Sequence, residues 1–185
     1  MVFLNPALRW CVLLAVLLAV PSAAPAQSPQ PTLENDVKAA FLFNFIKFVE
    51  WPAPSPPDEP FRVCAVAAPP FLAALDRTIA EESVGGRQLV RAEAGSEAAV
   101  RRCAILYVGS GYAEQGAPLL AAARDLPVLT VGEGSQFVKH GGAIGFLLEN
   151  NRVRFDISLR AVQRSGLKVS SKLLRVARTV EGGAE

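Results

Sequence analysis

The segment AILYVGSGYAEQGAPLLAAAR, residues 104–124, joins an unbroken apolar run to a glycine-bearing turn and an alanine- and leucine-rich stretch. The run AILYV is typical of a buried strand, and residues 112–124 are typical of a helix. A strand that is apolar at every position, rather than at every second one, has both faces covered. The segment therefore predicts a strand–helix unit of an α/β domain, with strand 104–108 near the centre of its sheet.

Comparable units are expected on both sides of this segment. Further strands are predicted at 61–67, 87–92 and 127–131, with helices between them at 70–83 and 96–101. Strands alternating with helices indicate a mainly parallel sheet with helices on both faces.

The two ends of the domain complete the prediction. A helix is expected at 32–49, stopped by Trp51-Pro52. Residues 143–148 and 152–157 are predicted to form an antiparallel pair, which makes the sheet mixed, and 158–180 to form helix, a short extended stretch and helix. The fold class is thus a single α/β domain with a mainly parallel, mixed sheet flanked by helices on both faces.

The first 26 residues have the pattern of a secretory signal peptide. Arg9 precedes the apolar run WCVLLAVLLAV, and Pro21 and small residues follow it up to Ala26. The run is shorter than the roughly 18 to 20 residues that a membrane-spanning helix needs. We therefore expect residues 1–26 to be a cleaved leader and residues 27–185 to form one domain in an oxidising compartment.

The overall charge narrows the possible partners. The 19 Lys and Arg nearly balance the 17 Asp and Glu, so electrostatics give no reason to expect nucleic acid as a partner.

Once Cys11 leaves with the leader, Cys64 and Cys103 remain, each in an apolar strand-like run. Two cysteines in an exported protein favour one disulfide, for which adjacent strands could bring them close enough. The alternative is a pair of buried free thiols.

No catalytic or metal-binding residue and no cofactor is predicted from the sequence. The one histidine, His140, stands beside two glycines, where a capping or surface role is more common. The turn Gly109-Ser110-Gly111 follows a strand, as phosphate-binding turns do. It lacks the third glycine of a dinucleotide fingerprint because Glu114 occupies that position, so a tight turn is the favoured interpretation.

The unusual feature is the aromatic stretch FLFNFIKFVEW, residues 41–51. On a helix its apolar residues cover two faces, whereas a helix packed on one core needs a single stripe. One interpretation is that part of this surface binds a partner, and the candidate contact residues are Phe41, Phe45, Phe48 and Trp51. The alternative is a helix wrapped entirely within its own fold.

Six blocks occur in an order that resembles the YfiR family of bacterial periplasmic regulatory proteins, across essentially the whole of 27–185. They are the strands that carry Cys64 and Cys103, together with VKAAFLFNFIKFVEWP (37–52), PVLTVGEGSQFVKHGGAIGF (127–146), RVRFDISL (152–159) and GLKVSSKLLRVAR (166–178).

The resemblance implies a periplasmic repressor without catalytic activity. Such a protein binds the periplasmic sensor region of an inner-membrane enzyme, in the best-known system the diguanylate cyclase YfiN, and lowers cyclic-di-GMP and biofilm formation. Other members are thought to serve histidine kinases, and dimers are known.

The resemblance also bears on the cysteines. It places Cys64 and Cys103 where the family has a strand-to-strand disulfide. The second pair of some members is absent, since no cysteine stands between positions 136 and 152.

A function of a different class is a periplasmic small-molecule-binding module. It would use turns such as 132–134 at the edge of the sheet.

Overall fold

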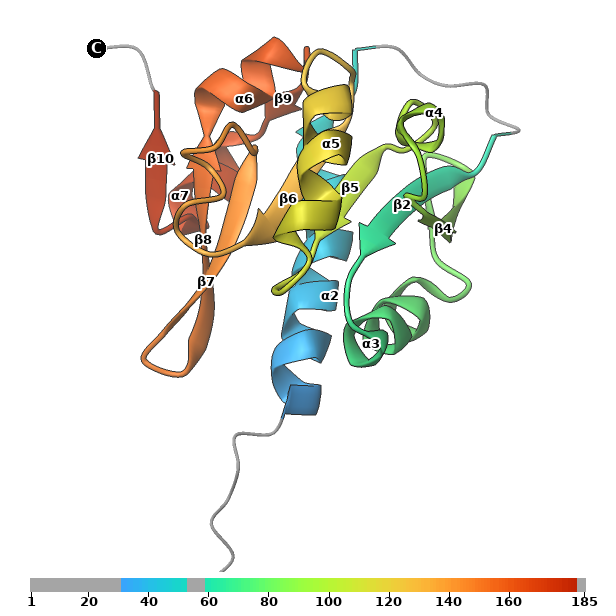
Figure 1. Cartoon of the computed structure of the whole chain (residues 1–185), viewed down its shortest axis with the longest axis horizontal. Coiled ribbons are helices and arrows are strands. Elements are labelled where there is room, and N and C mark those ends of the chain that lie inside the picture. The colour runs from blue at the N-terminus through green and yellow to red at the C-terminus, as the bar shows by residue number, and fades with distance from the viewer. Residues whose placement is uncertain (1–30, 53–58, 183–185) are drawn as a thin grey trace, which may run out of the picture. The chain divides into compact units, whose positions relative to one another are not determined.

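The computed structural model describes residues 31–52 and 59–182. The predicted leader and the cleavage point after Ala26 lie outside the described residues. Within the described part, one eight-stranded sheet has the order β10-β8-β7-β6-β5-β2-β4-β3 (Figure 1). Its strands are β2 (Phe61–Val66), β3 (Ser83–Val84), β4 (Arg87–Glu93), β5 (Ile105–Val108), β6 (Leu129–Glu133), β7 (Ile144–Glu149), β8 (Arg152–Ser158) and β10 (Thr179–Glu181).

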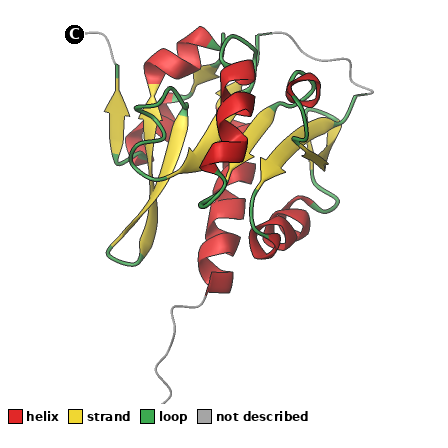
Figure 2. Cartoon of the chain, in the orientation of Figure 1, coloured by secondary structure: helices red, strands yellow, loops and turns green. Residues whose placement is uncertain are grey.

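Helices cover both faces of the sheet. Figure 1 shows α5 in front of the sheet and α2 behind it, and Figure 2 shows the same layers by secondary structure. A second, two-stranded sheet pairs β1 (Val49–Glu50) with β9 (Lys168–Val169). The helices are α2 (Pro31–Phe48), α3 (Pro69–Ile79), α4 (Glu97–Val100), α5 (Ala113–Ala123), α6 (Leu159–Arg164) and α7 (Ser171–Val176).

The predicted fold class is confirmed, with β5 in the interior of the sheet. Strand β5 pairs in parallel with β2 on one side and with β6 on the other. All four of its residues are buried. Ile105 and Tyr107 belong to the apolar cluster of α2 and α3, whereas Leu106 and Val108 belong to that of α4 and α5. Both faces of the strand are thus covered, which is why its sequence is apolar without alternation.

Helix α5 lies close to β5 because of a glycine. A Cβ atom on Gly116 would lie 2.4 Å from Cγ1 of Val108, well inside van der Waals contact. Any larger residue at this position would push the helix away from the sheet.

The predicted antiparallel pair is formed by β7 and β8, with Ile144 opposite Ile157 and Glu149 opposite Arg152. Asn150 and Asn151 make the two-residue turn with φ of 50° and 59°. Asparagine tolerates this left-handed conformation better than most residues, and such turns match the twist of a hairpin.

Two predicted helices are shorter in the structure. Helix α3 ends at Ile79, and Ser83 instead begins the short strand β3. The last helix ends at Val176, and residues 179–181 form β10, which the sequence analysis missed. The guanidinium of Arg178 donates to both carboxylate oxygens of Asp156 in β8, at 2.8 and 2.5 Å, and holds this segment extended beside β8.

Candidate functional site

A groove of about 750 Å³ opens beyond the carboxyl ends of β5 and β6, between α5 and β7. We call it the α5–β7 groove. Its apolar wall consists of Ala117, Leu120, Phe137, Phe146, Leu147 and Leu148. Its charged residues are Glu34, Lys38, Glu114, Arg124 and Glu133, and His140 also lines it.

The groove lies next to the point where the sheet reverses its direction of winding, between β2 and β5. The chain leaves β2 toward β4 on one side of the β2–β5 pair, and it leaves β5 toward β6 on the other side. Open α/β sheets form a crevice where the direction of winding reverses, outside the carboxyl ends of the strands. At this point the N–H of Gly109 donates to the carbonyl of Val66 at 2.9 Å.

The glycine turn after β5 is the tight turn expected from the sequence. Gly111 has φ of 81°, in the left-handed region that glycine occupies without strain. A Cβ atom on Gly109 would lie 2.8 Å from Cβ of Ala67, so the two neighbouring loops touch here.

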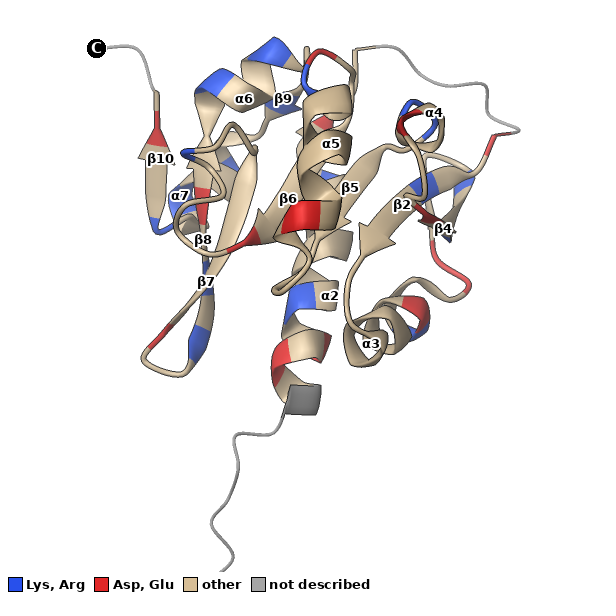
Figure 3. Ribbon diagram, viewed as in Figure 1, with Lys and Arg blue, Asp and Glu red and all other residues tan. Residues whose placement is uncertain are grey.

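A partly buried charge network from α2, β5 and β6 lines the groove; Figure 3 shows the charged residues of α2 and of the end of β6. The ammonium of Lys38 donates to Oε2 of Glu133 at 2.7 Å and lies 2.5 Å from Oε1 of Glu34. The buried hydroxyl of Tyr107 donates to the other oxygen of Glu133. One lysine therefore serves two carboxylates, and the three charged groups together carry one negative charge.

Two groups of this network, Lys38 and Tyr107, have pKa values raised above their ordinary values. Burial by itself would lower the pKa of Lys38, but hydrogen bonds and charges from Glu133 and Glu34 outweigh burial and raise it. Burial, followed by the charge and hydrogen bond of Glu133, raises the pKa of Tyr107 far above its ordinary value. Lys38 is thus charged and Tyr107 neutral under physiological conditions.

The sequence by itself did not predict this network. The one local signal was the spacing of Glu34 and Lys38, four residues apart on a predicted helix, where opposite charges pair. Glu133 lies 95 positions from Lys38, and nothing in the sequence links them.

The structure corrects one of the candidate contact residues. Phe45 is fully buried, with its ring centroid 5.7 Å from Phe146 and 5.1 Å from Phe155. It is a core residue and cannot contact a partner in this structure, because the sheet already covers that face of α2.

The other candidate residues on α2 and after it lie at the margin of the same core. Phe41, Phe48 and Trp51 are half-buried and pack against it. The ring of Trp51 stands edge-on to Phe61, with centroids 5.0 Å apart. The four candidate residues therefore do not form one exposed patch.

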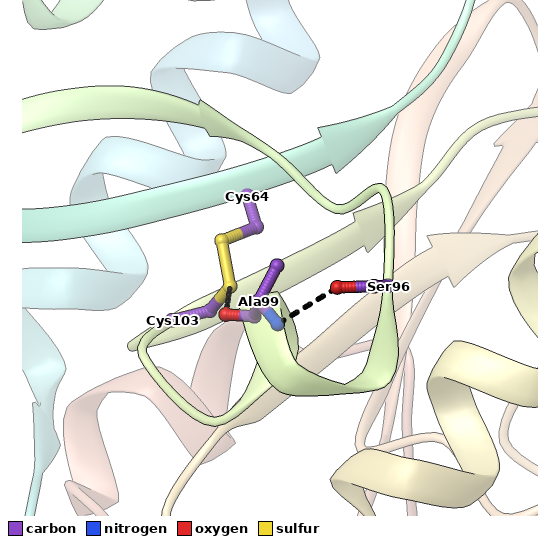
Figure 4. The surroundings of a disulfide bond; sticks show 4 residues. All are labelled: Cys64, Ser96, Ala99 and Cys103. Carbon is purple, nitrogen blue, oxygen red and sulfur yellow. Dashed lines mark hydrogen bonds between the residues drawn. A yellow bond between two sulfur atoms is a disulfide. The ribbon is translucent and has the colours of Figure 1, made fainter.

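Cys64 and Cys103 form the predicted disulfide, with Cα atoms 5.8 Å apart (Figure 4). Cys64 lies in β2, but Cys103 lies in the connection between α4 and β5, not in a strand as predicted. The side chain of Ser96 accepts from the N–H of Ala99 and caps the short helix α4, and Sγ of Cys103 lies 3.2 Å from the carbonyl oxygen of Ala99. The bond thus ties α4 to the sheet.

Among the described residues, no group of three His, Cys, Asp or Glu side chains is placed to hold a metal ion. None of the helices in this part of the chain is long and apolar enough to cross a membrane.

Two solved structures share the fold. A conserved domain protein from Vibrio cholerae O1 biovar El Tor has a TM-score of 0.55 at 12% identity, with 80% of this chain and 60% of that chain covered. The ABC domain from Streptococcus pneumoniae, solved in complex with L-Trp, has a TM-score of 0.52 at 10% identity, with 77% and 61% covered. The chain thus spans about three fifths of the length of these two proteins.

The layers, the mixed sheet and the groove at its carboxyl edge define an α/β domain. The sequence profile of the YfiR/HmsC-like family matches residues 35–178, and the protein belongs to this family. The family consists of periplasmic regulatory proteins.

Proposed function

We propose that this protein is a periplasmic negative regulator that binds the sensor region of an inner-membrane signalling enzyme. The enzyme is a YfiN-type diguanylate cyclase, and the regulator lowers cyclic-di-GMP and biofilm formation. The observation that carries the proposal is the family match, which extends from residue 35 to residue 178.

Two further features support the proposal. The leader pattern of residues 1–26 directs a chain out of the cytoplasm. The disulfide between Cys64 and Cys103 suits an oxidising compartment, where such bonds persist.

For the contact with the sensor, we propose the half-buried aromatic residues at the end of α2. Phe48 and Trp51 are partly accessible, unlike Phe45. Half-buried aromatic rings supply much binding energy when a partner completes their desolvation.

The proposal is tested by deleting the gene and measuring cyclic-di-GMP by mass spectrometry. Deletion is expected to raise cyclic-di-GMP, and the wild-type gene to restore it. Cross-linking of the tagged protein in the periplasm should recover an inner-membrane protein with a cyclase domain. Unchanged cyclic-di-GMP together with no recovered membrane protein would contradict the proposal.

The contact surface is tested separately with Phe48→Ala, which leaves the buried residue Phe45 in place. We expect a several-fold loss of recovered partner and incomplete restoration of cyclic-di-GMP. Lys47→Ala is the matched control, because Lys47 is exposed on the same helix but does not share the face of Phe48. Equal recovery with both variants would remove Phe48 from the interface and leave the regulatory function standing.

A second candidate function is the binding of a small molecule. The observation that favours it is the α5–β7 groove, whose volume of about 750 Å³ lies in the usual range of ligand sites.

A further inference from the structure

We infer that the α5–β7 groove binds an apolar primary amine, with its ammonium at the Glu34–Lys38–Glu133 end and its hydrocarbon part along α5 and β7. The inference rests on the second candidate function above and is independent of the regulatory one.

The apolar body of the ligand follows from the groove wall. Ala117 and Leu120 of α5 face this space from one side, and Leu147 and Leu148 of β7 line it from the other. Leu148 is 53% exposed and adds accessible apolar surface to this wall. Phe137 gives the wall a fixed shape, because its ring packs directly against Gly132 and Gly142. A Cβ atom added at these glycines would lie 2.2 and 2.1 Å from carbon atoms of the ring. A hydrocarbon chain in this groove would remove apolar surface from water on both partners.

The sign of the ligand charge follows from the network. Lys38 is shared between two carboxylates, so the group carries one uncompensated negative charge. Tyr107 donates a hydrogen bond to Glu133 and is itself neutral, so it brings no positive charge to the group. Glu114, in the first turn of α5, adds a further negative charge at the same end.

A carboxylate or phosphate ligand is correspondingly disfavoured. The amino end of α5 carries a partial positive charge, but Glu114 stands in that first turn, and the Lys38 ammonium is already neutralised. Arg124 and His140 line the groove too, but Arg124 lies at the opposite end of α5. An ammonium is therefore the head group that the charged end of the groove complements.

The side chain of Glu34 offers the direct contact. Among the residues that the structure describes, Lys38 engages its Oε1, and the side chain is 37% exposed. Its second oxygen is available to accept from a ligand ammonium, whereas both oxygens of Glu133 already accept hydrogen bonds.

The test titrates purified, 15N-labelled protein with n-hexylamine, n-hexanol and hexanoate, which share one chain and differ in head-group charge. Hexylamine is expected to bind with a dissociation constant on the order of 1 mM, as suits so small a ligand. Changes in amide chemical shift, followed by NMR, should be largest at α5, Gly134 and residues 146–148. Hexanol should bind about fivefold more weakly and hexanoate more weakly still, because the site carries net negative charge.

Two variants locate the site. Ala117→Trp fills the groove from an exposed position of α5 and should weaken hexylamine binding at least about tenfold. Gln115→Trp, exposed on the same helix but not lining the groove, is its control and should bind as the wild type. Glu34→Gln should abolish the preference for hexylamine over hexanol, whereas Glu97→Gln on α4 removes the same charge elsewhere and should preserve it.

The outcomes distinguish two claims, that the groove binds small molecules and that it prefers an amine. Equal binding of all three probes at the groove would overturn the amine assignment and keep the groove as a small-molecule site. No shift at the groove with any probe would overturn both. Shifts that persist unchanged in Ala117→Trp would place the binding elsewhere and also overturn the inference.

Discussion

The ammonium of Lys38 in α2 lies 2.7 Å from Oε2 of Glu133 at the end of β6, although 95 positions separate the two residues. This pair joins the N-terminal helix to the edge of the sheet where the α5–β7 groove opens. Lys38 is only 5% exposed, so its ammonium depends on these carboxylates rather than on water for its hydrogen bonds.

Replacement of Lys38 by methionine is expected to lower the free energy of unfolding by about 1 to 3 kcal/mol, because the partly buried carboxylate of Glu133 keeps only its hydrogen bond from Tyr107. Urea unfolding followed by circular dichroism measures the change. Lys139→Met is the control, since Lys139 is exposed and its loss should cost less than about 0.5 kcal/mol. Similar effects of the two substitutions would show that the buried pair does not contribute as described.

Stability should fall as the pH rises above about 10, near the ordinary pKa values of Tyr107 and Lys38. The pKa of each group is raised in the folded protein, so the folded state retains protons that the unfolded chain releases. The stabilisation is complete below the unfolded pKa values and is lost as the pH rises further. Urea unfolding from pH 8 to 11 measures this loss of unfolding free energy. Tyr107→Phe should remove the part of the pH dependence that comes from the tyrosine. An unaltered pH dependence in Tyr107→Phe would contradict the assignment.

Loss of the disulfide is expected to lower the free energy of unfolding by roughly 3 to 4 kcal/mol in the chain-entropy model, since 39 positions separate Cys64 and Cys103. The double variant Cys64→Ala, Cys103→Ala should show this loss without added reductant, and reductant should destabilise the wild type alone. Mass spectrometry should show a gain of two hydrogens on reduction. Alkylation of both thiols in unreduced protein would rule the bond out.

Because Phe45 is more deeply buried than Phe48, its replacement by alanine is expected to lower the stability more. Phe45→Ala should cost about 3 to 5 kcal/mol because it opens a cavity beside Phe146. Phe48→Ala should cost only about 1 to 2 kcal/mol, since its ring is already half-exposed. Thermal unfolding of the two variants checks the order, and a reversed order would contradict the packing of α2.

The leader predicts that the exported protein begins at Gln27. Intact mass and N-terminal sequencing of the periplasmic protein measure the start directly. Ala26→Phe places a large residue in the small-residue position before the cut and should leave the precursor uncleaved. A mature protein that retains residues 1–26 would show that this segment is not a signal peptide.

Much of the sheet could be predicted from the sequence because buried parallel strands have a local signature. The run at β5 is apolar throughout and those at β2 and β6 are mostly apolar, and glycines mark the turns after β5 and β6. Strand β10 has no such signature, since its three residues are exposed or half-exposed. Its place depends on the contact between Arg178 and Asp156, which lie on different elements.

The candidate site shows the same contrast between features with a local sequence signal and features set by tertiary contacts. Residues 104–124, together with the leader and the cysteine pair, were enough to predict the α/β class, the position of β5 within the sheet and a disulfide, because each depends on residue type and short-range order. Only the tertiary structure decided that Phe45 is core while Phe48 remains half-exposed, because both faces of α2 are apolar and the sheet selects one. It also decided that Lys38, Glu133 and Tyr107 meet, since charges far apart in the chain interact only after the fold brings α2 against the carboxyl edge of the sheet.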